Sequence, residues 1–168
     1  MTTKPRTLYL VRHAIAAASG PAWPDDTKRP LTHKGVARMR EAVRGLRAFG
    51  VTIDQVLASP LVRAKQTAEI LVEGLKPAPA LTVLPALAPG IAPPQLAEAL
   101  AQFKKPQAIA LVGHEPGLGE FGAWLIGARA PLPFKKGGIA RIDVPNVPPA
   151  GAGQLVWFST PKMLRSLA

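Results

Sequence analysis

The apolar residues of the chain fall into short runs separated by segments with helical spacing. The runs are rich in Val, Ile and Leu, which is typical of buried β-strands. Strands that alternate with helices predict an α/β protein. The six expected strands are TLYLVRH (7–13), IDQVLAS (53–59), LTVLP (81–85), AIALVGH (108–114), IARIDV (139–144) and QLVWFST (154–160).

The clearest helical pattern follows Thr32, whose hydroxyl is suited to capping a helix N-terminus. Gly50 fits the position that closes the helix. One face of this helix is apolar, and its cations lie elsewhere on a solvated face. The apolar positions are Val36, Met39, Val43 and Leu46.

Three further helices are predicted. The second should begin with Ser59 as N-cap and Pro60 at the first helical position. The third covers residues 93–103, and the fourth opens at Pro116. The fourth contains three glycines, which weaken a regular helix but permit close packing.

Length and composition indicate one soluble globular domain over residues 1–168. No apolar run is long enough to span a membrane, and the segment MTTKPRTLYL (1–10) lacks the features of a signal peptide, so we expect a cytoplasmic protein. The chain has no cysteine, which excludes disulfides, thiol nucleophiles and cysteine-ligated metals. The net charge of +11 indicates an anionic partner.

Three predicted strands end in residues that suit an anion. Arg12 and His13 end the first strand, Arg63 lies in the helix that follows the second, and His114 ends the fourth. Carboxyl ends of strands and helix N-termini form ligand sites in open α/β sheets, and helix N-termini favour phosphate. Each residue alone is more often structural, but together they predict an anion pocket. His33 has no such context and is expected at the surface.

These motifs resemble the histidine phosphatase superfamily, in particular its small SixA-type phosphohistidine phosphatases. The similarity extends from about Leu8 to Phe158 and is carried by LVRHAIA, RPLTHKG, VLASPLVRAKQTAEIL, VLPALAPG, LVGHEPGLGEF and GGIARIDV. It implies a three-layer α/β/α sandwich with a mostly parallel sheet of the phosphoglycerate mutase type.

The resemblance also implies roles for the strand-end residues. His13 would be the nucleophile that carries a transient phosphoryl group, and Arg12, Arg63 and His114 would hold the phosphoryl oxygens, with Glu115 beside them at the substrate. A neutral imidazole is needed at His13, and neighbouring cations favour it. His114 would be more useful protonated, as a clamp on developing charge. No metal ion or cofactor is expected.

The sequence also departs from the wider family. Ala14 stands where glycine is commoner, and Ser19 stands where the wider motif has asparagine. The intervals between the motifs leave little room for the cap that carries a catalytic acid in relatives acting on phosphate monoesters. The acids in that interval, Glu73 and Glu98, fit exposed helix positions. The remaining candidate proton donors are Asp25, Asp26 and Glu115.

A site without a dedicated acid favours phosphohistidine, because imidazole is a far better leaving group than an alkoxide. We therefore expect a metal-independent phosphatase whose partner is a phosphorylated protein, such as a histidine phosphotransfer domain. Two alternatives stay open. One is hydrolysis of small phosphate monoesters or phosphoanhydrides by the same fold, and the other is a noncatalytic basic module that binds phosphoprotein or nucleic acid. Nucleic acid is disfavoured because the cations are dispersed and aromatic residues are few.

Overall fold

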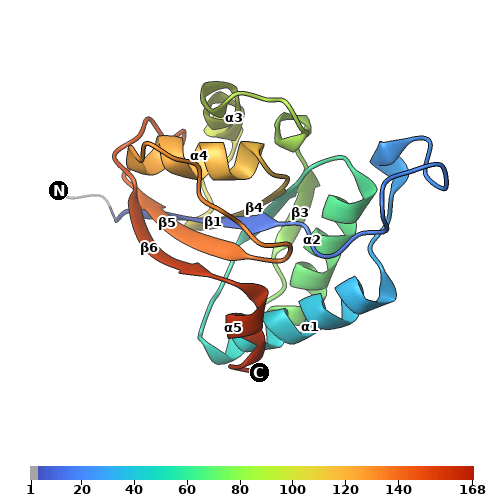
Figure 1. Ribbon diagram of the computed structural model, residues 1–168. Helices are drawn as coiled ribbons and strands as arrows, with labels where there is room; N and C mark the ends of the chain where they lie inside the picture. The colour runs from blue at the N-terminus through green and yellow to red at the C-terminus, as the bar shows by residue number, and fades with distance from the viewer. Residues whose placement is uncertain (1–3) are drawn as a thin grey trace.

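The computed structural model describes residues 4–168, so the first three residues of the segment from which localisation was inferred lie outside it. A six-stranded sheet runs through the protein (Figure 1). All six predicted strands are present. They are β1 (Arg6–Arg12), β2 (Gln55–Ala58), β3 (Ala80–Val83), β4 (Ala108–Gly113), β5 (Ile139–Val144) and β6 (Gln154–Ser159).

The sheet has the strand order β3-β2-β4-β1-β5-β6. β1, β2, β3 and β4 pair in parallel, whereas β5 is antiparallel to both of its neighbours, so every strand except β5 runs in the same direction. The expectation of a mostly parallel sheet is confirmed. The carboxyl ends of β1, β2 and β4 consequently lie side by side at one edge.

Helices cover both faces of the sheet, which confirms the three-layer α/β/α architecture. Alternate residues of β1 point to opposite faces, so Tyr9 and Val11 join one apolar cluster and Leu8 and Leu10 join the other. The first cluster is covered by α1, α2 and α5, and the second by α3 and α4 (Figure 1). The helices are α1 (His33–Ala48), α2 (Val62–Gly74), α3 (Pro93–Ala99), α4 (Gly117–Ile126) and α5 (Pro161–Arg165).

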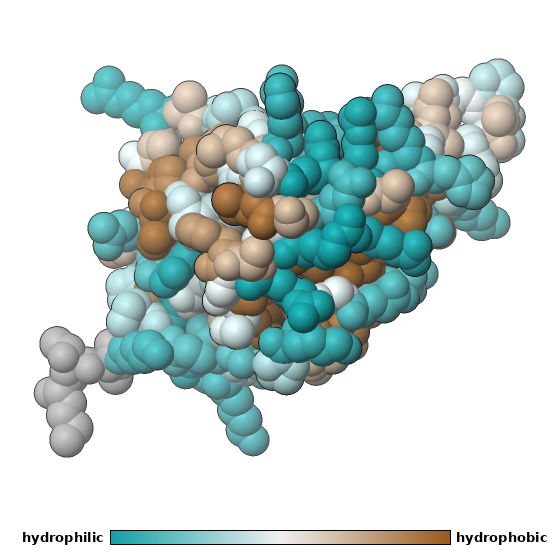
Figure 2. All heavy atoms as spheres, turned by 90° about the horizontal axis from the view of Figure 1, so that it is seen from below, coloured by the Kyte–Doolittle hydropathy of each residue, from teal (hydrophilic) through white to brown (hydrophobic). Residues whose placement is uncertain are grey.

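The start of α1 agrees with its sequence signals. The Thr32 hydroxyl accepts a hydrogen bond from the Gly35 N–H at 2.9 Å, and Gly50 follows the helix with a φ of +80°. Seen from the side that carries α1 and α5, the surface is mainly hydrophilic, with apolar patches between the charged side chains (Figure 2). Such a surface fits the amphipathic pattern of α1.

The predicted start of the second helix was wrong by two residues. The N-cap of α2 is Leu61, which has no side-chain cap, and the helix begins at Val62. Ser59 instead lies at the end of β2, where its backbone N–H donates to the Val112 carbonyl at 3.0 Å. Its hydroxyl contacts the His114 ring, as described below.

The segment between β3 and β4 belongs to the helical layer. It contains the short helix η2 (Pro85–Leu87), α3 and η3 (Leu100–Gln102). Leu96, Ala97 and Leu100 are buried in the cluster that contains Leu8 and Leu10, so this segment covers the sheet. Three of the helices were not predicted, namely η1 (Asp26–Lys28), η2 and α5. Within residues 4–168 no helix combines the length and apolarity needed to cross a bilayer.

Candidate active site

The register of the sheet brings three strand ends together. Arg12 of β1 pairs with Gly113 of β4, and Val112 of β4 pairs with Ala58 of β2. The residues that follow these ends are therefore neighbours at the carboxyl edge of the sheet. They are His13, His114 and Ser59, and all three are buried.

The His13 imidazole has a fixed tautomer. Its Nδ1 lies 2.8 Å from the Ala14 carbonyl oxygen, and because a carbonyl can only accept, Nδ1 must carry the hydrogen. In the neutral ring the lone pair is then on Nε2. The ring centroid lies 5.2 Å from that of His114, and the two planes are tilted by 52°. His13 thus presents an unprotonated nitrogen beside a second imidazole.

The His114 imidazole is held by Ser59, a contact that the sequence did not reveal. His114 Nε2 lies 2.7 Å from the Ser59 hydroxyl oxygen, which already accepts the Leu61 N–H at 3.3 Å. A neutral ring with its hydrogen on Nδ1 would accept the Ser59 hydroxyl hydrogen at Nε2. Nδ1 is buried and has no hydrogen-bond partner within residues 4–168.

Arg63 is buried in the first turn of α2 and is anchored by the loop before α1. Its Nη1 donates to the Asp26 carbonyl at 2.9 Å, and its Nη2 lies 3.1 Å from the Asp26 carboxylate. The same carboxylate accepts from Arg29 Nε at 2.9 Å. Asp26 therefore joins two guanidinium groups at the site. The sequence did not assign these roles to Asp26 and Arg29, because only the folded loop brings them to Arg63.

The Arg12 side chain is held by the loop before β5. Its Nη1 donates to the Phe134 carbonyl at 2.7 Å. Glu115 lies close enough for the Arg12 charge to lower its carboxyl pKa, an effect shared by the backbone N–H groups of Phe134 and Gly119. Burial outweighs these effects and raises the pKa of Glu115. The structure thus places Glu115 next to the predicted anion site, as a carboxyl whose pKa lies above its ordinary value.

Thr67 connects the nucleophile segment to α2. Its hydroxyl accepts the Ala14 N–H at 3.0 Å and donates to the Arg63 carbonyl at 2.8 Å. The chain that follows His13 is therefore tied to the helix that carries Arg63. The helical spacing of Arg63 and Thr67 places both on one face of α2, which is the signal that could have revealed this link.

Both histidines of the site are held neutral. Burial is the main reason that the pKa of His13 is lowered to about 4. The hydrogen bond to the Ala14 carbonyl raises this pKa, whereas the charges of the nearby arginines lower it; these are Arg63, Arg12 and Arg29. Burial also lowers the pKa of His114 to about 3, and the neighbouring His13 adds to this. The expected neutrality of His13 is confirmed. The expectation of a protonated His114 was wrong for the ligand-free protein, because desolvation penalises its charged form.

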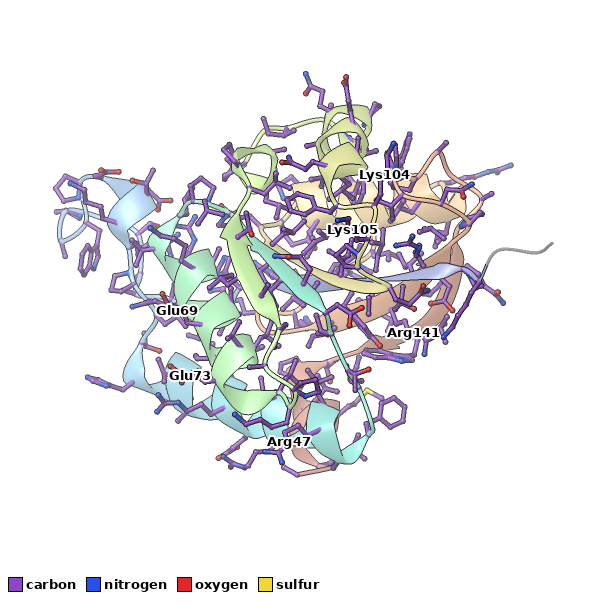
Figure 3. All side chains as sticks on the ribbon, turned by 180° about the vertical axis from the view of Figure 1, so that it is seen from behind. Arg47, Glu69, Glu73, Lys104, Lys105 and Arg141 are labelled. Atoms are coloured by element: carbon purple, nitrogen blue, oxygen red, sulfur yellow. The ribbon has the colours of Figure 1, made fainter. Side chains whose placement is uncertain are left out.

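The candidate proton donors differ in their ionisation. The pKa of Asp25 is lowered by hydrogen bonds from Thr27, and that of Asp26 by its bonds with Arg29 and by Arg63. Both are therefore carboxylates at neutral pH, whereas Glu115 is shifted toward its acid form. Glu69 and Glu73 lie on the outer surface of α2 (Figure 3), and Glu98 is also exposed. His33 is exposed at the first position of α1, as expected.

Buried polar atoms without hydrogen-bond partners within residues 4–168 gather at this site. They are Arg12 Nε, Arg63 Nε, His114 Nδ1 and Glu115 Oε1. Buried polar groups are normally paired, so unpaired ones need an explanation. The three nitrogens are all potential donors, which suits the oxygens of a tetrahedral anion. No cluster of three potential metal-ligating side chains is found within residues 4–168.

Two cavities border the site. One, of about 300 Å³, is lined by His114, Glu115 and the η2–α3 segment. The other, of about 800 Å³, is lined by Arg12, Ala14 and segments of α1 and α5. His13 lies between Arg12 and Ala14 in the chain, so the second cavity begins at the residues that flank the predicted nucleophile.

Comparison with known proteins agrees with this geometry. Residues 8–88 match the histidine phosphatase superfamily (branch 1). An uncharacterized protein of Picosynechococcus sp. is 39% identical over 120 residues, which cover 68% of this chain and 69% of that protein. The chain belongs to the histidine phosphatase superfamily.

Other relatives of this histidine phosphatase cover almost its whole length. Phosphohistidine phosphatase SixA of Escherichia coli is 29% identical over 161 residues, which cover 94% of this chain and 96% of that protein. The solved structure of the protein histidine phosphatase SixA complexed with tungstate superposes with a TM-score of 0.81 at 27% identity, covering 94% of this chain and 99% of that chain. We therefore place the protein among the hydrolases of the histidine phosphatase superfamily.

Proposed function

We propose that this histidine phosphatase removes the phosphoryl group from phosphohistidine in a protein, through a covalent intermediate on His13. The observation that carries the proposal is the neutral His13 imidazole, whose Nδ1 is engaged by a carbonyl while its Nε2 keeps the lone pair. A neutral imidazole is nucleophilic, and a protonated one is not.

The reaction has two steps. The Nε2 lone pair of His13 attacks phosphorus as the P–N bond to the substrate imidazole breaks, and the departing imidazole takes up a proton from water. Water then attacks phosphorus, the P–N bond to His13 breaks, and phosphate leaves while His13 recovers its lone pair. No step uses a metal ion or a cofactor.

Arg12, Arg63 and His114 bind the phosphoryl oxygens in this proposal. Arg12 Nε, Arg63 Nε and His114 Nδ1 are buried without partners within residues 4–168, so an anion would complete their hydrogen bonding. Donors already in position need little reorganisation as charge develops on the phosphoryl group. A relative of the same fold binds tungstate, which is also a tetrahedral oxyanion.

The substrate class follows from the leaving group. Asp25 and Asp26 are ionised and cannot donate a proton at neutral pH, and Glu98, the acid of the segment between β3 and β4, is exposed. Imidazole departs with modest protonation, whereas an alkoxide needs a strong donor. The resemblance to phosphohistidine phosphatase SixA supports the same class.

A second candidate is hydrolysis of small phosphate monoesters. Glu115 favours it, because burial raises its pKa and it lines a cavity beside His114. A protonated Glu115 could supply the proton that an alkoxide requires.

The test compares two substrate classes on the purified protein. We expect kcat/KM for a histidine phosphotransfer domain phosphorylated on histidine to exceed that for any member of a sugar phosphate panel by about 100-fold or more. A preference for sugar phosphates would reject the proposal in favour of the second candidate. The His13→Ala variant should lose turnover of both classes, while His33→Ala, at an exposed histidine, should keep it.

A further inference from the structure

The larger cavity beside the site is lined by cations from four separate parts of the chain. Its volume is about 800 Å³, and no carboxylate residue lines it. The segments that meet there are the end of β1, α1, the loop before β5, and α5. The cationic lining residues are Arg12, Arg38, Lys135, Lys136, Lys162 and Arg165.

Most of these cations have no acidic partner among the described residues. Arg165 is paired with Glu41 at 3.7 Å, and Arg12 is bonded to the Phe134 carbonyl. Within residues 4–168, the other four lie more than 4.0 Å from every carboxylate oxygen, and all four are exposed. Hydrophilic side chains gather on the face of the molecule that carries α1 (Figure 2). Unpaired cations around one hollow repel each other, and an anionic occupant would relieve that repulsion.

The position of the cavity indicates what that occupant is. One of its lining residues is Arg12, which the proposed function places on the phosphoryl oxygens. A phosphohistidine bound at His13 would therefore bring the neighbouring surface of its own protein to the cavity. A small phosphate ester that is held by the catalytic residues would leave most of the 800 Å³ unfilled.

We propose that this cavity is the docking surface for acidic side chains that flank phosphohistidine in the substrate protein. The proposal rests on the proposed phosphohistidine phosphatase function and adds a specificity determinant to it. Complementary charge guides association and excludes partners of the wrong sign. The protein would accordingly select phosphohistidines on acidic surfaces.

The test uses two synthetic phosphohistidine peptides that differ only in having glutamates or glutamines on either side of the phosphohistidine. We expect the wild-type protein to hydrolyse the glutamate peptide with a kcat/KM about tenfold higher, and added salt should diminish the difference. In the Arg38→Glu/Lys162→Glu variant the preference should disappear. These two cations line the cavity, and within residues 4–168 their side chains form no ion pair.

The matched control is Arg47→Glu/Lys104→Glu. It also replaces one exposed arginine and one exposed lysine by glutamates, and neither residue lines the cavity (Figure 3). This variant should keep the preference within about twofold of wild type, because distant surface charges are screened. An equal loss in both double variants would overturn the proposal, since overall net charge would then explain the effect.

The remaining outcomes are also decisive. Equal hydrolysis of both peptides by the wild-type protein overturns the docking proposal and leaves the proposed function intact. Failure to hydrolyse either peptide overturns both. Inhibition by duplex DNA that is lost in the Arg38→Glu/Lys162→Glu variant, with no preference between the peptides, would assign the cavity to nucleic acid. Should this variant fail to fold by circular dichroism, Arg38→Gln/Lys162→Gln should still reduce the preference.

Discussion

At the scale of single residues, the surroundings of His13 and His114 determine their ionisation. Both imidazoles are buried, and cations lie near both, so their pKa values fall to about 4 and about 3. The folded protein therefore carries two neutral imidazoles at pH values where free histidine is protonated. Nucleophilic reactivity at His13 should thus persist in mildly acidic solution.

A titration of the His13 ring by ¹H–¹⁵N NMR tests this ionisation. We expect His13 to stay neutral, with its hydrogen on Nδ1, until the pH falls toward about 4. The resonance is assigned by its loss in His13→Asn. Protonation with a midpoint near the ordinary histidine value of about 6.5 would contradict the described environment.

The same shifts predict how stability depends on pH. Below about pH 6.5 the unfolded chain binds protons at both histidines, but the folded protein does not until the pH reaches about 4 at His13 and about 3 at His114. The free energy of unfolding should therefore decrease as the pH falls from 6.5 toward 4. In urea titrations the decrease should be smaller for His114→Asn, and an unchanged pH dependence in that variant would contradict the prediction.

Arg63 has a role that a substitution can measure. Removing one donor to a developing oxyanion costs about 2–4 kcal/mol of transition-state stabilisation, so kcat/KM of Arg63→Ala should fall by at least about 30-fold. Lys65→Ala removes a cation from the same helix and should have little effect. A decrease of only a few fold in Arg63→Ala would exclude Arg63 from the proposed anion contacts.

Some residues of the site could be predicted from the sequence and others could not. His13, Arg63 and His114 follow strands or begin helices, which are local signals. Ser59 could not be assigned, because its hydroxyl serves His114 across the sheet edge instead of capping α2. Arg29 reaches the site through the fold of an irregular loop, which no periodicity describes.

At the scale of secondary-structure elements, close contacts between helices and other segments set the packing. A Cβ on Gly45 of α1 would overlap the Leu164 carbonyl of α5, and one on Gly35 would overlap the Ile15 carbonyl. Glycine at these positions lets the backbones approach. α5 was not predicted, so the need for Gly45 could not be inferred from the sequence.

The contact between α1 and α5 predicts a stability effect. Gly45→Ala should lower the free energy of unfolding by about 1–3 kcal/mol, because overpacking outweighs the gain in helix propensity of up to about 1 kcal/mol. Gly117→Ala is the control, since a Cβ at that helical position meets no atom within 4 Å. Denaturation in urea measures both. A Gly45→Ala protein as stable as wild type would refute this packing.

At the scale of the whole molecule, the order of the strands creates the site. Local patterns predict six strands and four of the helices, but they do not show that β1 lies between β4 and β5. That arrangement places His13 beside His114, although the two residues lie far apart in the sequence. The family resemblance implied that His13 and His114 act at one site, and the register of β1 with β4 accounts for this physically.

The spatial distribution of the positive charges is determined only by the folded molecule. The +11 charge comes from cations dispersed along the chain, and Arg47, Arg141 and the Lys104–Lys105 pair lie on separate parts of the molecule (Figure 3). Yet Arg38, Lys135, Lys136 and Lys162 surround one cavity beside the site. Because these cations come from distant segments, no charge run in the sequence marks the cavity.

The central claim is that His13 carries the phosphoryl group during turnover, and trapping the intermediate tests it most directly. A phosphohistidine substrate labelled with ³²P is mixed with the protein, the reaction is quenched within milliseconds in alkali, where phosphohistidine survives, and the labelled peptide is identified by mass spectrometry. We predict phosphate on Nε2 of His13 and none in His13→Ala. Turnover with the label on another residue, or with no labelled protein at any time, would contradict the account.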